Sequence, residues 1–354
     1  MKIALISHLH HAIAEPFLGG TEMHTAIVAD ELVRRGHDVT LFAQQGSRTL
    51  ARLVEIVGTD FRFRGMFGPD GQDRSEAVLV EVVTRAIETI RTEGFDLVFN
   101  NSLGPLPYTM LAGHPMITVL HTPPTLEKVN AVITRPDWRP DPLHAYVSVS
   151  ETNSEAWRAL LPSTVCVPNG IYLDQWADDG RVEQELAVWT GRITPEKGLH
   201  LAIAAARLAG MRLEFSGPVA DPSYYASAVA PELDEDIVYL GHADHRELGR
   251  LLGRGAVYVS SSLWAEPFGL ASVEAMACGT PVAAVPNGAA FEIVGETGGC
   301  VARDKSVRGL AEAIKLARDC DRGLVRAGVQ RFDAQLMMDR YEHVMAPLVR
   351  AASR

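Results

Sequence analysis

The chain of 354 residues is poor in cysteine, in aromatic residues and in long apolar runs. Its few cysteines are scattered and lack the paired spacing of metal sites, which favours reduced thiols and a cytoplasmic protein. No apolar run approaches the roughly 20 residues that a bilayer-spanning helix needs. The apolar run near the start is also too short for a signal peptide. We therefore expect at most peripheral contact with a membrane.

Positive charge is also scarce. The chain carries 33 lysines and arginines against 44 aspartates and glutamates, for a net charge of −11. Nucleic-acid-binding domains are typically basic, so we expect no nucleic-acid partner. An anionic ligand would have to be bound by local positive groups.

The length suits two domains of roughly 150 to 180 residues each. Short apolar strands alternate with helical segments, which indicates an α/β fold with parallel sheets. The first strand is not followed by a G-x-G-x-x-G turn, and Ala43, Gln44 and Gln45 stand where a dinucleotide-binding fold places an acidic residue. A dinucleotide-dependent oxidoreductase is therefore disfavoured.

The segment Tyr258 to Val285 reads as a strand, a loop with a carboxylate and a glycine, a helix and a second strand. Ligand sites have this layout at the carboxyl edge of parallel sheets. Free N–H groups of Gly269 and Leu270 would lie at the helix start, where anions and hydroxyls bind well. Glu274 follows Glu266 by about two helical turns, so two carboxylates on one wall could accept hydrogen bonds from several hydroxyls.

The residues from Glu266 to Val282 read E-P-F-G-L-x-x-x-E-A-M-A-x-G-x-P-V. This segment resembles the paired-glutamate motif of the retaining GT-B glycosyltransferases of group 1 (family four). An amphipathic helix with two solvated glutamates would explain neither the Pro-Phe-Gly turn nor the matching segments elsewhere. The resemblance implies two doubly wound, Rossmann-like α/β domains that face each other across a cleft.

A second matching segment contains two cations. As a bare basic pair, Arg192 and Lys197 would more often be solvated surface charges. In the pattern G-R-[hydrophobic]-x-x-x-K-G they match the family's phosphate clamp, in which a forked guanidinium and a compact ammonium hold a diphosphate. Gly19 and Gly20 match a G-G-x-E segment whose backbone approaches that diphosphate in relatives, and Thr21 is placed to cap the next helix.

His121 directly follows a predicted strand, residues 116–120. A single histidine is more often structural than catalytic, but the end of a parallel strand is a favourable place for a functional one. Family members carry a histidine at the matching position, in contact with the transferred sugar. The resemblance therefore assigns His121 to that sugar.

The resemblance assigns the remaining roles residue by residue. Glu274 holds the ribose and Glu266 the sugar ring, while Arg192 and Lys197 stabilise the departing diphosphate. The other donor-binding positions are backbone or loop groups: Gly19, Gly20, Gly217, Gly241, His242, Ala243, Phe268, Gly269 and Leu270. We expect no metal site and no cofactor, with a nucleotide diphosphate sugar as co-substrate.

The expected domains are an acceptor domain, 1–167, joined by a terminal helix, 332–354, and a donor domain, 168–331. The expected reaction is retaining, metal-independent transfer of a hexosyl unit from a UDP-sugar to a hydroxyl, by same-face attack assisted by the leaving phosphate. The acceptor is a small molecule, a lipid-linked molecule or a glycan, and the loop from Arg64 to Asp73 is one of those expected to select it. A glycan phosphorylase, a sugar-phosphate synthase and a catalytically silent nucleotide-sugar-binding protein remain alternatives.

Overall fold

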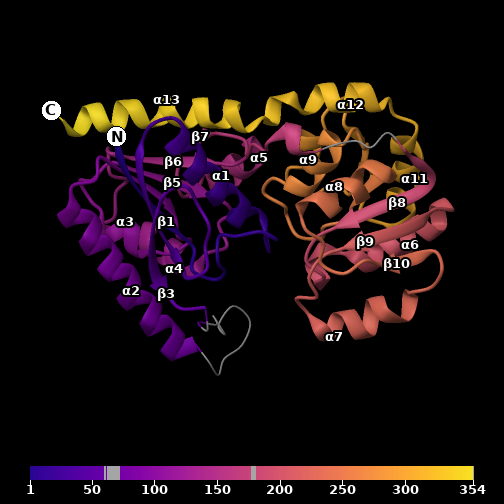
Figure 1. The fold of residues 1–354 in the computed structure, drawn as a ribbon, viewed down its shortest axis with the longest axis horizontal. Helices are drawn as coiled ribbons and strands as arrows, with labels where there is room; N and C mark the ends of the chain where they lie inside the picture. Colours follow the sequence, from indigo (N-terminus) through magenta and orange to yellow (C-terminus); the bar gives the residue numbers. More distant parts are fainter. Residues whose placement is uncertain (60, 62–71, 177–180, 354) are drawn as a thin grey trace. The chain divides into compact units, whose positions relative to one another are not determined.

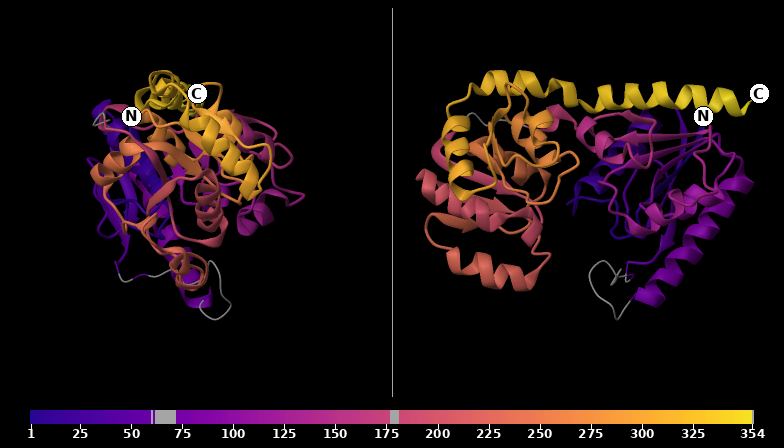
Figure 2. Two further views of the ribbon diagram at one scale, coloured as in Figure 1. Left: turned by 90° about the vertical axis from the view of Figure 1, so that its right-hand side faces the viewer. Right: turned by 180° about the vertical axis from the view of Figure 1, so that it is seen from behind.

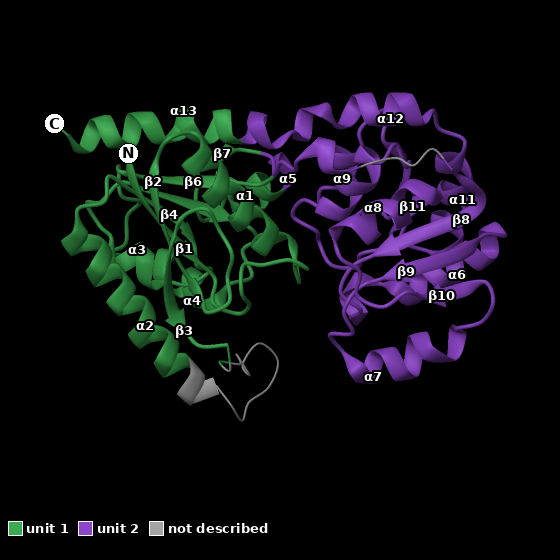
Figure 3. Cartoon of the chain, viewed as in Figure 1, with its two compact units in different colours: residues 1–149, 153–167, 338–354 green, residues 150–152, 168–337 purple. Residues whose placement is uncertain are grey.

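The computed structural model describes residues 1–59, 61, 72–176 and 181–353 (Figure 1). The chain forms two compact α/β units (Figure 3). Unit 1 comprises Met1–Val149, Asn153–Val167 and Met338–Arg354, and unit 2 comprises Ser150–Thr152 and Pro168–Met337. Residues 62–71, most of the loop expected to help select the acceptor, lie outside the described residues.

In the described part of unit 1, one sheet has seven strands in the order β3-β2-β1-β4-β5-β6-β7, and every paired strand is parallel. The strands are β1 (Lys2–Ser7), β2 (Asp38–Gln44), β3 (Arg52–Val57), β4 (Leu97–Asn101), β5 (Met116–Leu120), β6 (His144–Ser148) and β7 (Thr164–Cys166). The strand order reverses between β1 and β4. Parallel sheets bind ligands at the carboxyl edge of such a switch point.

Helices cover both faces of this sheet (Figure 2). They are α1 (Gly20–Arg34), α2 (Gln72–Glu93), α3 (Leu106–Met110), α4 (Glu127–Ile133), α5 (Glu151–Trp157) and the end of α13 (Ala334–Ala352). Successive side chains of β4 point to opposite faces. Val98 therefore packs in the cluster that contains Ile87 of α2, whereas the ring of Phe99 lies 4.9 Å from that of Tyr341 on α13.

In the described part of unit 2, a six-stranded sheet has the order β10-β9-β8-β11-β12-β13, again with parallel pairs. The strands are β8 (Glu183–Thr190), β9 (Arg212–Ser216), β10 (Ile237–Tyr239), β11 (Gly255–Ser260), β12 (Val282–Ala284) and β13 (Gly299–Val301). The order reverses between β8 and β11, which places a second switch point there.

The helices of unit 2 are α6 (Leu199–Ala209), α7 (Pro222–Tyr224), α8 (His245–Arg254), α9 (Leu270–Ala277), α10 (Ala290–Val294), α11 (Val307–Arg318) and α12 (Arg322–Gly328). α6 packs against α11, and α8 against α9. α8 begins with a capping box, in which Asp244 and Glu247 each accept the other's backbone N–H. None of the described helices is long and apolar enough to span a bilayer.

The predicted α/β class with two doubly wound parallel sheets is confirmed, and β5 has the predicted bounds. The predicted cap at Thr21 is wrong. The N-cap of α1 is Gly19 in an extended conformation, and Thr21 lies inside the helix, where its carbonyl accepts a 2.8 Å hydrogen bond from Thr25 Oγ1. The whole terminal helix, 332–354, was predicted to belong to the first domain. Its first residues, Phe332 to Met337, belong to unit 2 instead.

The two ends of α6 allow a matched test of backbone packing. Gly198 and Gly210 both have left-handed backbones, with φ of 68° and 72°. A Cβ on Gly198 would lie 2.2 Å from the carbonyl oxygen of Ser261, whereas a Cβ on Gly210 would meet nothing within 4 Å. We expect Gly210→Ala to lower the free energy of unfolding by about 1 kcal/mol. Gly198→Ala should cost at least twice as much in urea unfolding, and equal losses would contradict this packing.

Candidate active site

The loops at the switch point of unit 2 are built against each other. β8 pairs with β11, so the loop after β8, residues 191–198, adjoins the loop after β11, residues 261–269. Leu263 N–H donates to the carbonyl of Glu196 at 2.8 Å, and Ser261 Oγ donates to the carbonyl of Lys197 at 3.1 Å. Gly198 has no side chain to prevent this approach. These contacts therefore fix the two loops relative to each other.

A third loop, after β12, fixes the backbone of Glu266. Ala289 N–H donates to the carbonyl of Glu266 at 2.9 Å, and a Cβ on Gly288 would lie 2.2 Å from that same oxygen. The Asn287 amide donates to the carbonyls of Ser262 and Trp264, at 3.1 and 2.7 Å. The backbone of Ala289 therefore contacts the backbone of Glu266.

Four charged residues lie on these loops: Arg192, Glu196, Lys197 and Glu266. Lys197 Nζ contacts Glu266 Oε2 at 2.6 Å, with 21% and 27% of the two side chains exposed. Arg192 is exposed and has no hydrogen-bond or ion-pair partner among the described residues. Because an ammonium has three donors and the pair uses one, Lys197 keeps two for another oxyanion. This corner of unit 2 therefore offers two cations to an anionic ligand.

Glu274 lies on α9, partly buried, with no hydrogen-bond partner for its carboxyl among the described residues. Desolvation raises its pKa from 4.5 to about 7. A buried carboxylate without donors is costly, and hydroxyl donors from a ligand would remove that cost. The arrangement suits a polyol such as ribose.

A small pocket lies between these loops and α9. Its lining combines the Glu266 side chain with serines, Asn287 and apolar groups: Ser260, Ser262, Glu266, Phe268, Gly269, Ser272, Val285, Asn287, Ala290, Ile293 and Val294. Gly269 caps α9 with a left-handed φ of 96°, and the ring of Phe268 packs edge-on against that of Phe332 at 5.4 Å. Phe268 and Gly269, two of the residues predicted to bind the donor, thus line the pocket.

The loops after β9 and β10 are fixed mainly through backbone groups. Gly217 N–H and Ser216 Oγ donate to the carbonyl of Gly241, at 2.9 and 2.8 Å, and Ala243 N–H donates to Ser216 Oγ at 3.1 Å. A Cβ on Gly217 would lie 1.8 Å from the carbonyl oxygen of Gly191, which ties this loop to the one that carries Arg192. His242 is exposed.

In unit 1, His121 directly follows β5, the strand next to β4 in the sheet. His121 lies within a group of neutral imidazoles: its ring centroid is 4.7 Å from that of His24. Burial lowers the pKa of His121 well below 6.5, and the neighbouring His24 and His8 lower it further. His121 Nε2 contacts Asn101 Oδ1 at 3.1 Å, and Gly19 and Gly20 begin α1, one turn before His24. Unit 1 and unit 2 therefore each carry a separate group of the predicted residues.

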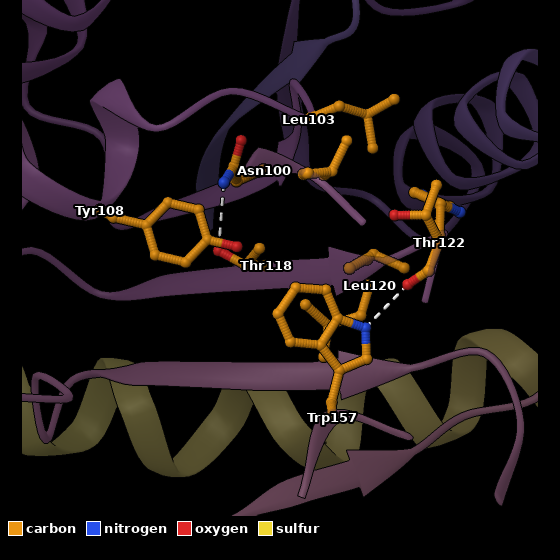
Figure 4. A pocket seen from close by; sticks show the side chains of 10 residues that line it. Asn100, Leu103, Tyr108, Thr118, Leu120, Thr122 and Trp157 are labelled. Atoms are coloured by element: carbon orange, nitrogen blue, oxygen red, sulfur yellow. Dashed lines mark hydrogen bonds between the residues drawn. The ribbon is translucent and has the colours of Figure 1, made fainter. Parts of the chain in front are cut away.

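A second pocket lies beside His121 (Figure 4). Asn100 Nδ2 donates to Thr118 Oγ1 at 3.1 Å, and Trp157 Nε1 donates to the carbonyl of Thr122 at 2.7 Å. The lining is otherwise apolar or aromatic, with Leu103 in a left-handed conformation at φ 59°. The lining side chains carry no lysine, arginine or carboxylate.

Several residues of these groups were not predicted from the sequence. His24 and Thr25 contact Asn101, and Tyr341 contacts His24, only through tertiary packing. Glu292 accepts the backbone N–H groups of Glu151 and Thr152, at 3.0 and 3.1 Å, and so caps α5. No cluster of three or more possible metal ligands lies within the described ranges.

The chain matches two family models of glycosyltransferases. The family model "Glycosyl transferases group 1" matches residues 176–326, and the model "Glycosyltransferase Family 4" matches residues 18–175. The two doubly wound units form the GT-B fold, as in sucrose-phosphate synthase from Thermosynechococcus elongatus, with a TM-score of 0.76 and 20% identity over 98% of this chain and 99% of that one. The chain belongs to the group 1 glycosyltransferases of the family four type and is a glycosyltransferase.

Two further proteins are similar to this chain. Phosphatidyl-myo-inositol mannosyltransferase from Propionibacterium freudenreichii is 27% identical over 335 residues, 88% of this chain and 84% of that protein. HepE from Anabaena, solved with UDP and glucose, has a TM-score of 0.75 and 20% identity, covering 98% of this chain and all of that one (100%).

The burial of the histidines predicts that the fold loses stability in acid. Burial lowers the pKa of His8 to about 4, below the 6.5 of an exposed imidazole. Between these values the unfolded chain binds the extra proton, so the free energy of unfolding falls as pH drops, by about 1.4 kcal/mol per pH unit per such histidine. Thermal unfolding from pH 7 to 4.5 should show a shallower loss for His8→Gln than for the wild type.

The matched control is His343→Gln, at an exposed position of α13, which should leave the loss unchanged. Equal slopes in the wild type and His8→Gln would contradict the burial of His8.

The raised pKa of Glu274 predicts the opposite effect of pH on the free energy of unfolding. Its raised pKa means that the folded state binds the extra proton between pH 4.5 and about 7, so the carboxyl destabilises the ligand-free fold as pH rises through this range. The penalty approaches about 3 kcal/mol above pH 7. Glu274→Gln should therefore raise the melting temperature more at pH 8 than at pH 5. No difference between the two pH values would show that the carboxyl is not desolvated.

Proposed function

We propose that this glycosyltransferase transfers a hexosyl unit from a UDP-sugar to an acceptor hydroxyl, with retention at the anomeric carbon and without a metal ion. The proposal is carried by the loops of unit 2 where Lys197 pairs with Glu266, and where Arg192 and the carboxyl of Glu274 have no hydrogen-bond partner among the described residues. Phosphate oxygens, sugar hydroxyls and ribose hydroxyls supply the groups that these side chains need.

Each side chain has one role in the proposal. Arg192 and Lys197 bind the diphosphate, whose negative charge grows as the bond to the anomeric carbon breaks. Glu266 accepts hydrogen bonds from the sugar ring hydroxyls while it orients Lys197. Glu274, ionised once ribose hydroxyls donate to it, holds the nucleoside. Gly217 and Gly241 to Ala243 would line the base through backbone groups.

We infer that the acceptor attacks the face from which the diphosphate leaves. The bond from the anomeric carbon to the phosphate oxygen breaks, the acceptor oxygen bonds to the same face, and the leaving phosphate takes the acceptor's proton. The transition state resembles an oxocarbenium ion, as in other glycosyl chemistry. The two cations replace the charge stabilisation that a metal supplies in other enzymes.

The relatives support this choice of substrates. HepE was solved with UDP and glucose, which favours a uridine donor. The similarity to phosphatidyl-myo-inositol mannosyltransferase favours a lipid-linked or small polyol acceptor. A sugar-phosphate acceptor, as in sucrose-phosphate synthase, is the second candidate, since that protein shares the fold. The cytoplasmic location stays a prediction.

Binding of the donor is tested first by thermal shift, with UDP-, GDP-, ADP- and dTDP-sugars in the presence of EDTA. A ligand that binds only the folded state stabilises it by about 2.7 kcal/mol at 100 times its Kd. We expect a shift with a UDP-sugar that Glu274→Gln abolishes at pH 8. A shift with NAD(P) or a sugar phosphate alone, or a need for a divalent cation, would overturn the proposal.

Lys197→Ala tests the phosphate clamp. Removing a group that stabilises transition-state charge should lower kcat/KM for donor hydrolysis or transfer by on the order of 100-fold. Lys315→Ala, at an exposed position of α11, is the matched control and should leave kcat/KM unchanged. A loss of threefold or less in Lys197→Ala would remove the clamp from the mechanism.

A further inference from the structure

A chain of buried polar side chains joins His121 to α1 and α13 within unit 1. His121 Nε2 lies 3.1 Å from Asn101 Oδ1, and Asn101 Nδ2 lies 3.0 Å from Thr25 Oγ1 and 3.3 Å from His24 Nδ1. His24 Nε2 lies 3.0 Å from the Tyr341 hydroxyl. Because Asn101, Thr25 and Tyr341 are fully buried, a lost hydrogen bond would leave an unpaired polar group.

The direction of these hydrogen bonds is set at Thr25. Its hydroxyl donates to the carbonyl oxygen of Thr21 at 2.8 Å, which uses its one proton. Thr25 Oγ1 must therefore accept from Asn101, so the asparagine turns its NH₂ group toward Thr25 and its carbonyl oxygen toward His121. An oxygen that only accepts requires a proton on His121 Nε2.

Both histidines are then neutral and in a defined tautomer. The second N–H of Asn101 needs a bare Nδ1 on His24, whose Nε2–H donates to Tyr341. Burial lowers the pKa of His24 to about 3 and that of His121 well below its ordinary value. His121 with a proton on Nε2 carries a lone pair on Nδ1, and that atom has no partner among the described residues.

We propose that Asn101, oriented by Thr25, is a positioning residue that holds His121 in the Nε2–H tautomer and leaves Nδ1 to accept a hydrogen bond from a hydroxyl of the transferred sugar. The inference rests on the proposed function and on the contact of His121 with the transferred sugar that the family resemblance implies. A neutral acceptor is also suited to a reacting sugar that gains positive charge, because an imidazolium would repel it.

The tautomer is measured directly on the ligand-free full chain by ¹⁵N NMR of the imidazole rings, with the His121 signals assigned by their loss in His121→Gln. The wild type should show a protonated Nε2 and a bare Nδ1. Asn101→Ala should lose this signature. Asn100→Ala, a buried asparagine of the same strand that bonds Thr118 instead, should keep it. A protonated Nδ1 in the wild type, or an unchanged signature in Asn101→Ala, would overturn the inference.

Kinetics separate positioning from a purely structural role. Asn101→Ala should lower kcat for turnover of the donor by roughly 10- to 100-fold, as small misplacements at a reacting centre do. The Kd of UDP should stay within about twofold, because UDP lacks the sugar. Thr25→Val should lower kcat in the same way, whereas Thr25→Ser keeps the hydroxyl and should restore it. If Asn101→Ala does not fold, the Thr25 pair decides the question.

The two proposals fail in different ways. If the wild type binds no nucleotide sugar, the proposed function fails, and with it the role of Nδ1. If the wild type turns over a donor but Asn101→Ala and Thr25→Val keep the wild-type kcat, the positioning role alone fails.

Discussion

The site of unit 2 depends on one constraint, the close approach of two backbone segments at the switch between β8 and β11. The carbonyl oxygen of Ser261 occupies the space that a side chain on Gly198 would fill. This approach brings Lys197 within 2.6 Å of Glu266. A second close approach, of Gly288 to the backbone of Glu266, fixes the position of that backbone. Glycines that lack room for Cβ thus place charges that lie far apart in the sequence.

The two units differ in the electrostatics of their functional groups. The group in unit 2 is ionic, with Arg192 unpaired among the described residues and Glu274 desolvated without a donor from them. The imidazoles of His121 and His24 in unit 1 are uncharged, because burial lowers their pKa values. A nucleotide diphosphate sugar has both kinds of chemistry, an anionic diphosphate and a sugar whose anomeric carbon becomes positive. The proposed mechanism assigns each kind to the group that suits it.

The sequence predicts the scaffold well where the signal is local. β11, α9 and β12 correspond to the strand, helix and strand predicted within Tyr258 to Val285, and the parallel order follows from alternating strands and helices. The spacing of Glu266 and Glu274 pointed to the site, but the raised pKa of Glu274 depends on tertiary burial that spacing does not encode. The contact of His24 with Asn101 spans 77 positions and leaves no local pattern. The Thr21 cap failed because side-chain preference at a helix start is a weak rule, and an extended glycine took the position.

The central claim is that this chain breaks a nucleotide-sugar bond with retention. It is tested most directly by following donor hydrolysis in real time with ¹H NMR of the anomeric proton. With an α-linked UDP-hexose, the account predicts that the α-anomer of the free sugar appears first and that the β-anomer follows only by mutarotation. Release of the β-anomer first would contradict retention, and release of no sugar by the wild type from any nucleotide-sugar donor would contradict the assigned chemistry.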